Sequence, residues 1–66
     1  MFDENIVKSV LLGKPLIEAR IICEFNNWDY RVVREDGESY VITMDLRLNR
    51  ANFTVINNII TEIDFG

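Results

Sequence analysis

The segment 41–53 holds the residues best suited to recognising another molecule. Met44, an apolar side chain, stands between Thr43 and Asp45, which both carry hydrogen-bonding side chains. Arg50 follows at a spacing that lets its guanidinium reach back to the Asp45 carboxylate, and such a charge-assisted contact is shorter and stronger than a neutral one. We expect this pair to hold an exposed contact residue in one conformation, which suits a binding loop.

The sequence lacks the residue types needed for most catalytic and metal sites. There is no His, and Cys23 is the only Cys, so neither a Cys-His nucleophile nor a His-ligated metal can be assembled. Glu35, Asp36 and Glu38 are interpreted as a solvated loop, because the EF-hand spacing for calcium is absent. We therefore expect a protein that is not an enzyme and uses no cofactor or metal.

Composition narrows the class of partner. The 66 residues are 48% hydrophobic and carry a net charge of −4, which predicts one folded domain over residues 1–66. No basic cluster exists to bind nucleic acid, and no apolar run approaches the roughly 20 residues that span a bilayer. Residues 1–5 do not resemble a signal peptide, so we expect a cytoplasmic protein, or a secreted one if a leader has been removed.

Periodicity predicts two helical segments followed by strands. Residues 1–11 form an N-terminal arm or a short helix capped by Asp3, and a main helix runs from Pro15, as its first residue, to about Asn26. The core side of the main helix is expected to comprise Leu16, Ala19, Ile22 and Cys23. Strands are predicted at 30–34, at 50–56 and, after an Asn57-Asn58 turn, at 59–65.

The connection 35–49 is long for so small a domain and too apolar for a flexible linker. We expect an ordered, exposed loop that joins two parallel strands, since a hairpin would not need that length. The predicted fold is therefore α+β, with one main helix packed on a small mixed sheet that carries a long exposed loop.

Four segments, in order and with matching spacing, resemble the potato inhibitor I family of serine-protease inhibitors, especially its small bacterial relatives. The segments are Leu12–Arg20, Tyr30–Arg34, Thr43–Arg47 with Arg50 and Asn52, and Ile60–Gly66. The likeness covers about residues 11–66, nearly the whole chain.

This resemblance implies that Met44–Asp45 is the scissile bond of an inhibitory loop. Met44 would fill the apolar specificity pocket of a subtilisin-like or chymotrypsin-like serine protease. Arg50 and Asn52 would support the loop from the following strand. The protease-binding loop would comprise Val41, Ile42, Thr43, Met44, Asp45, Leu46 and Arg47.

The chain departs from the family in several places. Asn52 stands where some members carry a second arginine, Leu46 where an aromatic is common, and Phe65 where bacterial relatives carry a disulfide cysteine. The run 34–42 is a residue or two longer than in plant members. The side chain of Arg47 is expected to be solvated only.

Ile17, Ile21 and Phe25 recur at i, i+4 and i+8, offset from the core side of the main helix. Either the N-terminal segment around Ile6, Val7 and Val10 covers them, or they form a surface for a partner or a homodimer. The alternative to inhibition is accordingly a cytoplasmic protein–protein interaction module that kept the scaffold and lost the inhibitory activity.

Overall fold

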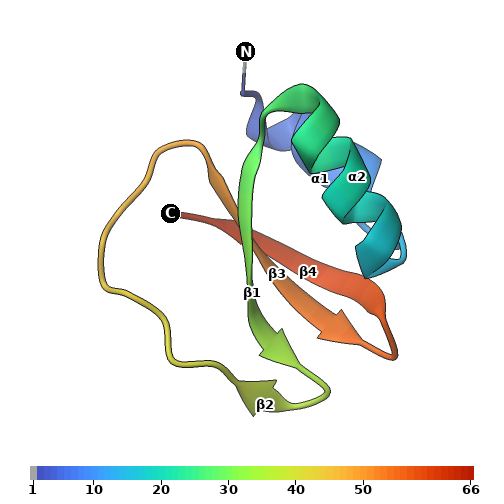
Figure 1. The fold of residues 1–66 in the computed structure, drawn as a ribbon, viewed down its shortest axis with the longest axis vertical. Helices are drawn as coiled ribbons and strands as arrows, with labels where there is room; N and C mark the ends of the chain where they lie inside the picture. The colour runs from blue at the N-terminus through green and yellow to red at the C-terminus, as the bar shows by residue number, and fades with distance from the viewer. Residues whose placement is uncertain (1) are drawn as a thin grey trace.

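The structure, a computed structural model that describes residues 2–66, has two helices on one side of a four-stranded sheet (Figure 1). The strand order is β2-β1-β3-β4, with β1 and β3 parallel and the other neighbours antiparallel. This confirms the predicted α+β class and the parallel pair. The elements are α1 (Glu4–Leu11), α2 (Leu16–Asn26), β1 (Asp29–Glu35), β2 (Glu38–Ser39), β3 (Arg50–Ile56) and β4 (Ile59–Phe65).

Both helices begin and end where local chemistry places the boundary. The Asp3 carboxylate accepts hydrogen bonds from the backbone N–H groups of Asn5 and Ile6, at 2.9 and 3.2 Å, which caps α1. Helix α2 ends at Asn27, whose left-handed φ of 56° stops the helix. Pro15 is the cap that precedes α2 rather than its first residue, because its extended backbone pairs with Ile59.

Two tight turns build the antiparallel pairs of the sheet. Asn57 and Asn58 both have positive φ (51° and 67°), as the predicted turn between β3 and β4 requires. Asp36 and Gly37 do the same (51° and 85°) between β1 and β2. Residues 35–39 were expected to be a loop, and that prediction is wrong because this turn lets Glu38 and Ser39 pair with the end of β1.

Alternation along β3 gives the sheet a packed face and an open face. Ala51, Phe53 and Val55 are fully buried, whereas Asn52 and Thr54 on the opposite face are half-buried. In the parallel register Asn52 lies beside Arg31 of β1. Two polar side chains from different strands therefore meet on the face that carries no helix.

The core lies between the helices and the packed face. It comprises Val7, Leu11, Leu16, Ala19, Cys23, Ala51, Phe53, Val55, Ile60 and Ile63. Tyr30 stacks on Phe53 with ring centroids 5.6 Å apart. Burial raises the pKa of the Cys23 thiol to about 11, so Cys23 behaves as a small apolar side chain. None of the described helices is long and apolar enough to cross a membrane.

Adjacent leucines in α1 and at its end provide a matched test of this core. Leu11 is fully buried, whereas Leu12 is 47% exposed. We expect Leu11→Ala to lower the free energy of unfolding by about 2–5 kcal/mol, because it leaves a cavity, and Leu12→Ala to lower it by less than about 1 kcal/mol. Urea denaturation followed by circular dichroism measures both changes, and equal losses would contradict the packing described here.

Candidate functional site

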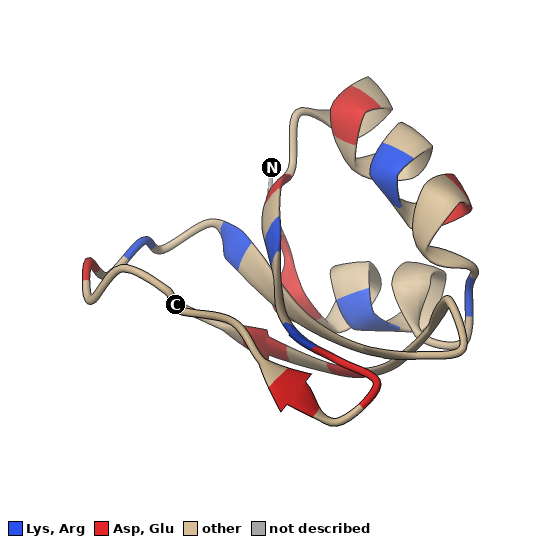
Figure 2. Ribbon diagram, turned by 60° about the horizontal axis from the view of Figure 1, so that its bottom comes forward, with Lys and Arg blue, Asp and Glu red and all other residues tan. Residues whose placement is uncertain are grey.

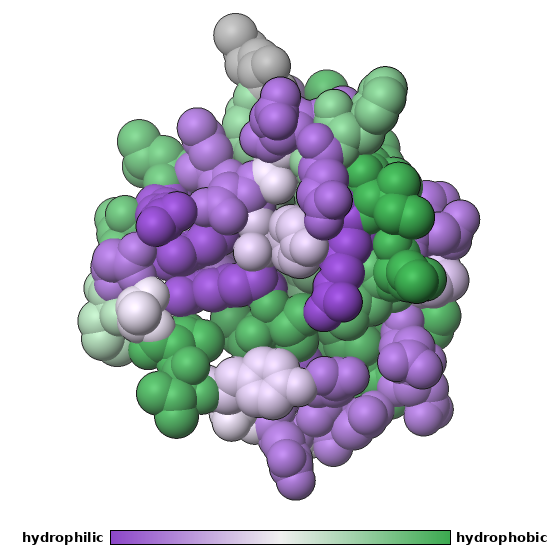
Figure 3. Space-filling view, in the orientation of Figure 1, coloured by the Kyte–Doolittle hydropathy of each residue, from purple (hydrophilic) through white to green (hydrophobic). Residues whose placement is uncertain are grey.

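The candidate site is the chain between β2 and β3, residues 40–49, which has no regular strand and projects away from both helices (Figure 2). Every residue of this loop is exposed, and Met44 is 97% exposed. Apolar side chains gather along this edge of the molecule, on the left of Figure 3, and include Val41, Ile42, Met44, Leu46 and Leu48. An exposed apolar edge of this kind is typical of a recognition surface.

Arg50, the first residue of β3, joins the loop to the sheet. Its side chain is only 6% exposed. Its Nη2 donates to the main-chain oxygen of Asp45 at 2.9 Å, and its Nη1 to the Asp45 carboxylate at 3.4 Å. Its Nε donates to the main-chain oxygen of Gly66 at 2.9 Å, beyond the end of β4. One guanidinium thus holds the loop and the C-terminal end of the sheet together.

Asp45 is also bound from within the loop. The Thr43 hydroxyl donates to one oxygen of the Asp45 carboxylate, and Arg50 and Arg47 donate to the other. The Thr43 hydroxyl, with Arg50 and Arg47, lowers the pKa of Asp45 from 3.8 to about 2. The carboxylate therefore stays charged, and able to accept these bonds, throughout the neutral range.

A second arginine holds the other side of Met44. Arg31 of β1 donates from Nη1 to the main-chain oxygen of Thr43 at 3.3 Å and to its hydroxyl at 3.4 Å. Its Nε donates to the Oδ1 atom of Asn52 at 2.7 Å. Asn52 was expected to support the loop itself, but its side chain orients Arg31, and Arg31 makes the contact.

Sequence reasoning missed Arg31 because the residue lies twelve positions before Thr43, in a different strand. The signal that could have found it is the parallel register, which places position 31 beside position 52. A polar residue at each of these positions, on the face opposite the core, predicts a contact across the two strands.

Arg47 is exposed, as expected, but it is paired and not merely solvated. Its Nη1 lies 2.9 Å from the carboxylate of Asp29 at the start of β1, and its Nε lies 3.3 Å from that of Asp45. Exposed ion pairs of this kind contribute only about 0–1 kcal/mol each. Arg47 therefore restrains the loop less than the buried Arg50.

The predicted partner surface on α2 lies apart from the loop. Ile17, Ile21 and Phe25 are 70%, 64% and 87% exposed, so the expectation that the N-terminal segment covers them is wrong. Helix α1 buries Val7 and Leu11 in the core instead and leaves Ile6 half-exposed.

The loop contacts restrain the backbone on both sides of one peptide bond. Arg31 binds the carbonyl before Met44, and Arg50 binds the carbonyl after it. The Met44 side chain itself extends into solvent. The arrangement presents an apolar side chain and the following peptide bond in a fixed conformation, without any nucleophile or acid–base pair of its own.

Comparison with known proteins gives no match, since no family model, no curated protein and no solved structure matches the chain. The choice among functions therefore depends on the geometry of the loop.

The low pKa of Asp45 predicts how the loop responds to acid. Because the pKa falls from 3.8 to about 2 in the folded protein, the contribution of the charged carboxylate is complete above pH 3.8 and is lost as the pH falls towards 2. Carboxyl-carbon NMR should show Asp45 titrating near 2. Thr43→Val should raise that midpoint towards 3.8, whereas Thr61→Val, in β4, should leave it unchanged. A wild-type midpoint near 3.8 would contradict the observed bonding.

Proposed function

We propose that this protein is a reversible, substrate-like inhibitor of a serine protease that prefers apolar residues, of the subtilisin-like or chymotrypsin-like kind. The loop 41–47 would enter the active site, with Met44 in the specificity pocket and Met44–Asp45 as the scissile bond. One observation carries this proposal: two arginines from two strands hold the carbonyl groups on either side of an almost fully exposed methionine. The sequence resemblance to the potato inhibitor I family supports the same reading.

The restraint accounts for affinity. A flexible peptide loses conformational entropy when a protease binds it, and that loss lowers its affinity. Here the backbone at Thr43 and Asp45 is already held by Arg31 and Arg50, so less entropy is lost on binding. Arg50 restrains the loop most effectively, since it is itself buried and bonded to Gly66.

The same restraint accounts for resistance to hydrolysis. Attack by the protease serine on the Met44 carbonyl would form an acyl-enzyme and release the amino group of Asp45. Arg50 would still hold Asp45 through its carbonyl and carboxylate, so that amino group would stay beside the ester. Attack by the amino group would re-form the peptide bond and release the serine, in competition with water.

The identity of the contact residue predicts specificity. The unbranched, polarizable side chain of Met suits an apolar pocket, whereas a pocket with a buried carboxylate leaves that charge without a partner. We expect the wild type to inhibit subtilisin and chymotrypsin but not trypsin.

Substitution of Met44 tests that specificity. Met44→Gly should weaken inhibition of both enzymes by about 100-fold, because a buried Met side chain is worth roughly 2–3 kcal/mol. Met44→Lys should transfer inhibition to trypsin. Leu48→Gly, a change at another exposed apolar residue of the loop, should have little effect. Inhibition constants from competition with a chromogenic substrate measure all four proteins. A folded wild type that inhibits neither subtilisin nor chymotrypsin would contradict the proposal for these enzymes.

Substitution of the two arginines tests the mechanism. Arg50→Ala should turn the protein into a substrate cleaved between Met44 and Asp45, and Arg31→Ala should weaken inhibition by about 10- to 100-fold, since each removes charged hydrogen bonds. Asn52→Ala should have a smaller effect in the same direction. Arg34→Ala, in the same strand as Arg31 but bonded to Ser39, is the control. Mass spectrometry after incubation with protease identifies the cut, and an uncleaved Arg50→Ala variant that inhibits like the wild type would refute bracing.

A second candidate function is an interaction module that lacks inhibition. The exposed Ile17, Ile21 and Phe25 on α2 favour it, because an inhibitory loop alone gives no reason for an apolar helix face. The two functions use different surfaces of the molecule, so one protein can have both.

A further inference from the structure

We propose that α2 is the interface of a symmetric homodimer, in which two copies pack antiparallel and Phe25 of each enters a pocket at the start of α2 in the other. The exposed row Ile17, Ile21 and Phe25 is called the α2 stripe below. It lies away from the loop 40–49, so the dimer is independent of protease inhibition (Figure 1).

The α2 stripe has the geometry of a helix-packing ridge. Its members are four residues apart and therefore lie in one row along the helix. Ile21 is at the centre, with Ile17 and Phe25 each about 6 Å away along the axis at 1.5 Å per residue. A two-fold axis at Ile21 would place Phe25 of one copy opposite Ile17 of the other, and both ends of the interface would then be identical.

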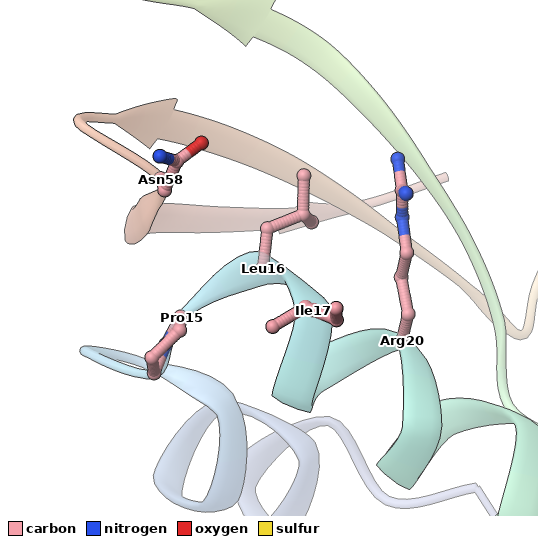
Figure 4. Close-up of a pocket in the computed structure, with 5 residues that line it drawn as sticks. All are labelled: Pro15, Leu16, Ile17, Arg20 and Asn58. Carbon is pink, nitrogen blue, oxygen red and sulfur yellow. The ribbon is translucent and has the colours of Figure 1, made fainter.

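The structure contains a receptor for Phe25 at that position. Pro15, Leu16, Ile17, Arg20 and Asn58 line a pocket of about 350 Å³ between the start of α2 and the β3–β4 turn (Figure 4). Phe25 itself lies at the other end of α2 and is 87% exposed, so it cannot fill the pocket of its own copy. The volume admits a phenyl ring, and the Arg20 guanidinium at the pocket wall can interact with the ring face.

Charges beside the stripe agree with the antiparallel arrangement. Arg20 and Glu24 are exposed on the same side of the stripe, and neither forms an ion pair within the described residues. The proposed axis leaves this side of both helices facing the same way. Arg20 of one copy then lies beside Glu24 of the other, and the pair occurs twice. A parallel arrangement would instead bring like charges together.

The size of the surface predicts a weak dimer. Three large side chains and a pocket on each copy supply on the order of 1,000 Å² of buried surface, close to the lower limit for specific association. We therefore expect a dissociation constant on the order of micromolar and a monomer in dilute solution.

Disulfide trapping tests the register. The two-fold axis passes beside position 21, so Ile21→Cys should give a disulfide-linked dimer on mild oxidation. Ile17→Cys should not, since the two copies of position 17 lie about 12 Å apart along the helix axis. The wild-type thiol, Cys23, is buried and serves as an unreactive background. Efficient trapping at position 17, or none at position 21, would overturn the proposed register.

Sedimentation velocity from micromolar to millimolar concentration tests the dimer itself. Phe25→Ser should raise the dissociation constant by at least about 10-fold, as expected for a central aromatic contact. Leu46→Ser, an exposed apolar residue of the loop, should not change it. Arg20→Glu and Glu24→Arg should each weaken the dimer, and the double variant should restore it. A wild type that stays monomeric at millimolar concentration, or a double variant as weak as each single one, would refute the proposal, and circular dichroism verifies that each variant is folded.

Discussion

The contact between the Arg50 guanidinium, the Asp45 main chain and the Gly66 main chain is the interaction on which the loop depends. Arg50 is the one buried charged residue in the part of the chain that the structure describes. A buried guanidinium is costly unless its N–H groups are bonded, and here Nε, Nη1 and Nη2 all have acceptors. Loss of the loop contacts would leave part of that charge without a partner, so the cost of burial itself favours the ordered loop.

The parallel pairing of β1 and β3 explains why there is a loop to hold. Parallel neighbours require a long connection from the end of one strand to the start of the next. In most α/β units a helix makes that crossover, but here both helices precede the sheet. The connection consists of the short β2 hairpin and then residues 40–49, which have no regular structure of their own. Side chains from the open face of the sheet, Arg31 and Arg50, supply the contacts that backbone pairing would otherwise provide.

The two helices divide the apolar residues of the N-terminal half unequally. Helix α1 has a distinct apolar side that buries Val7 and Leu11, whereas α2 is apolar on two sides and buries only one of them. The sheet covers Leu16, Ala19 and Cys23, and nothing in the chain covers the α2 stripe. A small domain has little surface to spare, so an uncovered row on its longer helix is a feature to explain, and a second copy explains it without any other protein.

The sequence by itself determined the local structure, because turns, caps and alternation depend on residues a few positions apart. Asp3 caps α1, Asn27 and the Asn57-Asn58 turn adopt positive φ, and the alternation of β3 selects Phe53 for the core and Asn52 for the open face. The same kind of reasoning identified Arg50 as a partner for Asp45, since five residues separate them.

Tertiary structure alone decided the contacts between distant segments. Arg31 reaches Thr43 only because the parallel register sets β1 beside β3, and Asn52 consequently acts through Arg31. The exposure of the α2 stripe followed from the path of α1, which packs Val7 and Leu11 into the core and does not cross α2. Hydrophobic periodicity shows that a helix has two apolar sides but does not say which will be covered, because that depends on how far the rest of a short chain extends.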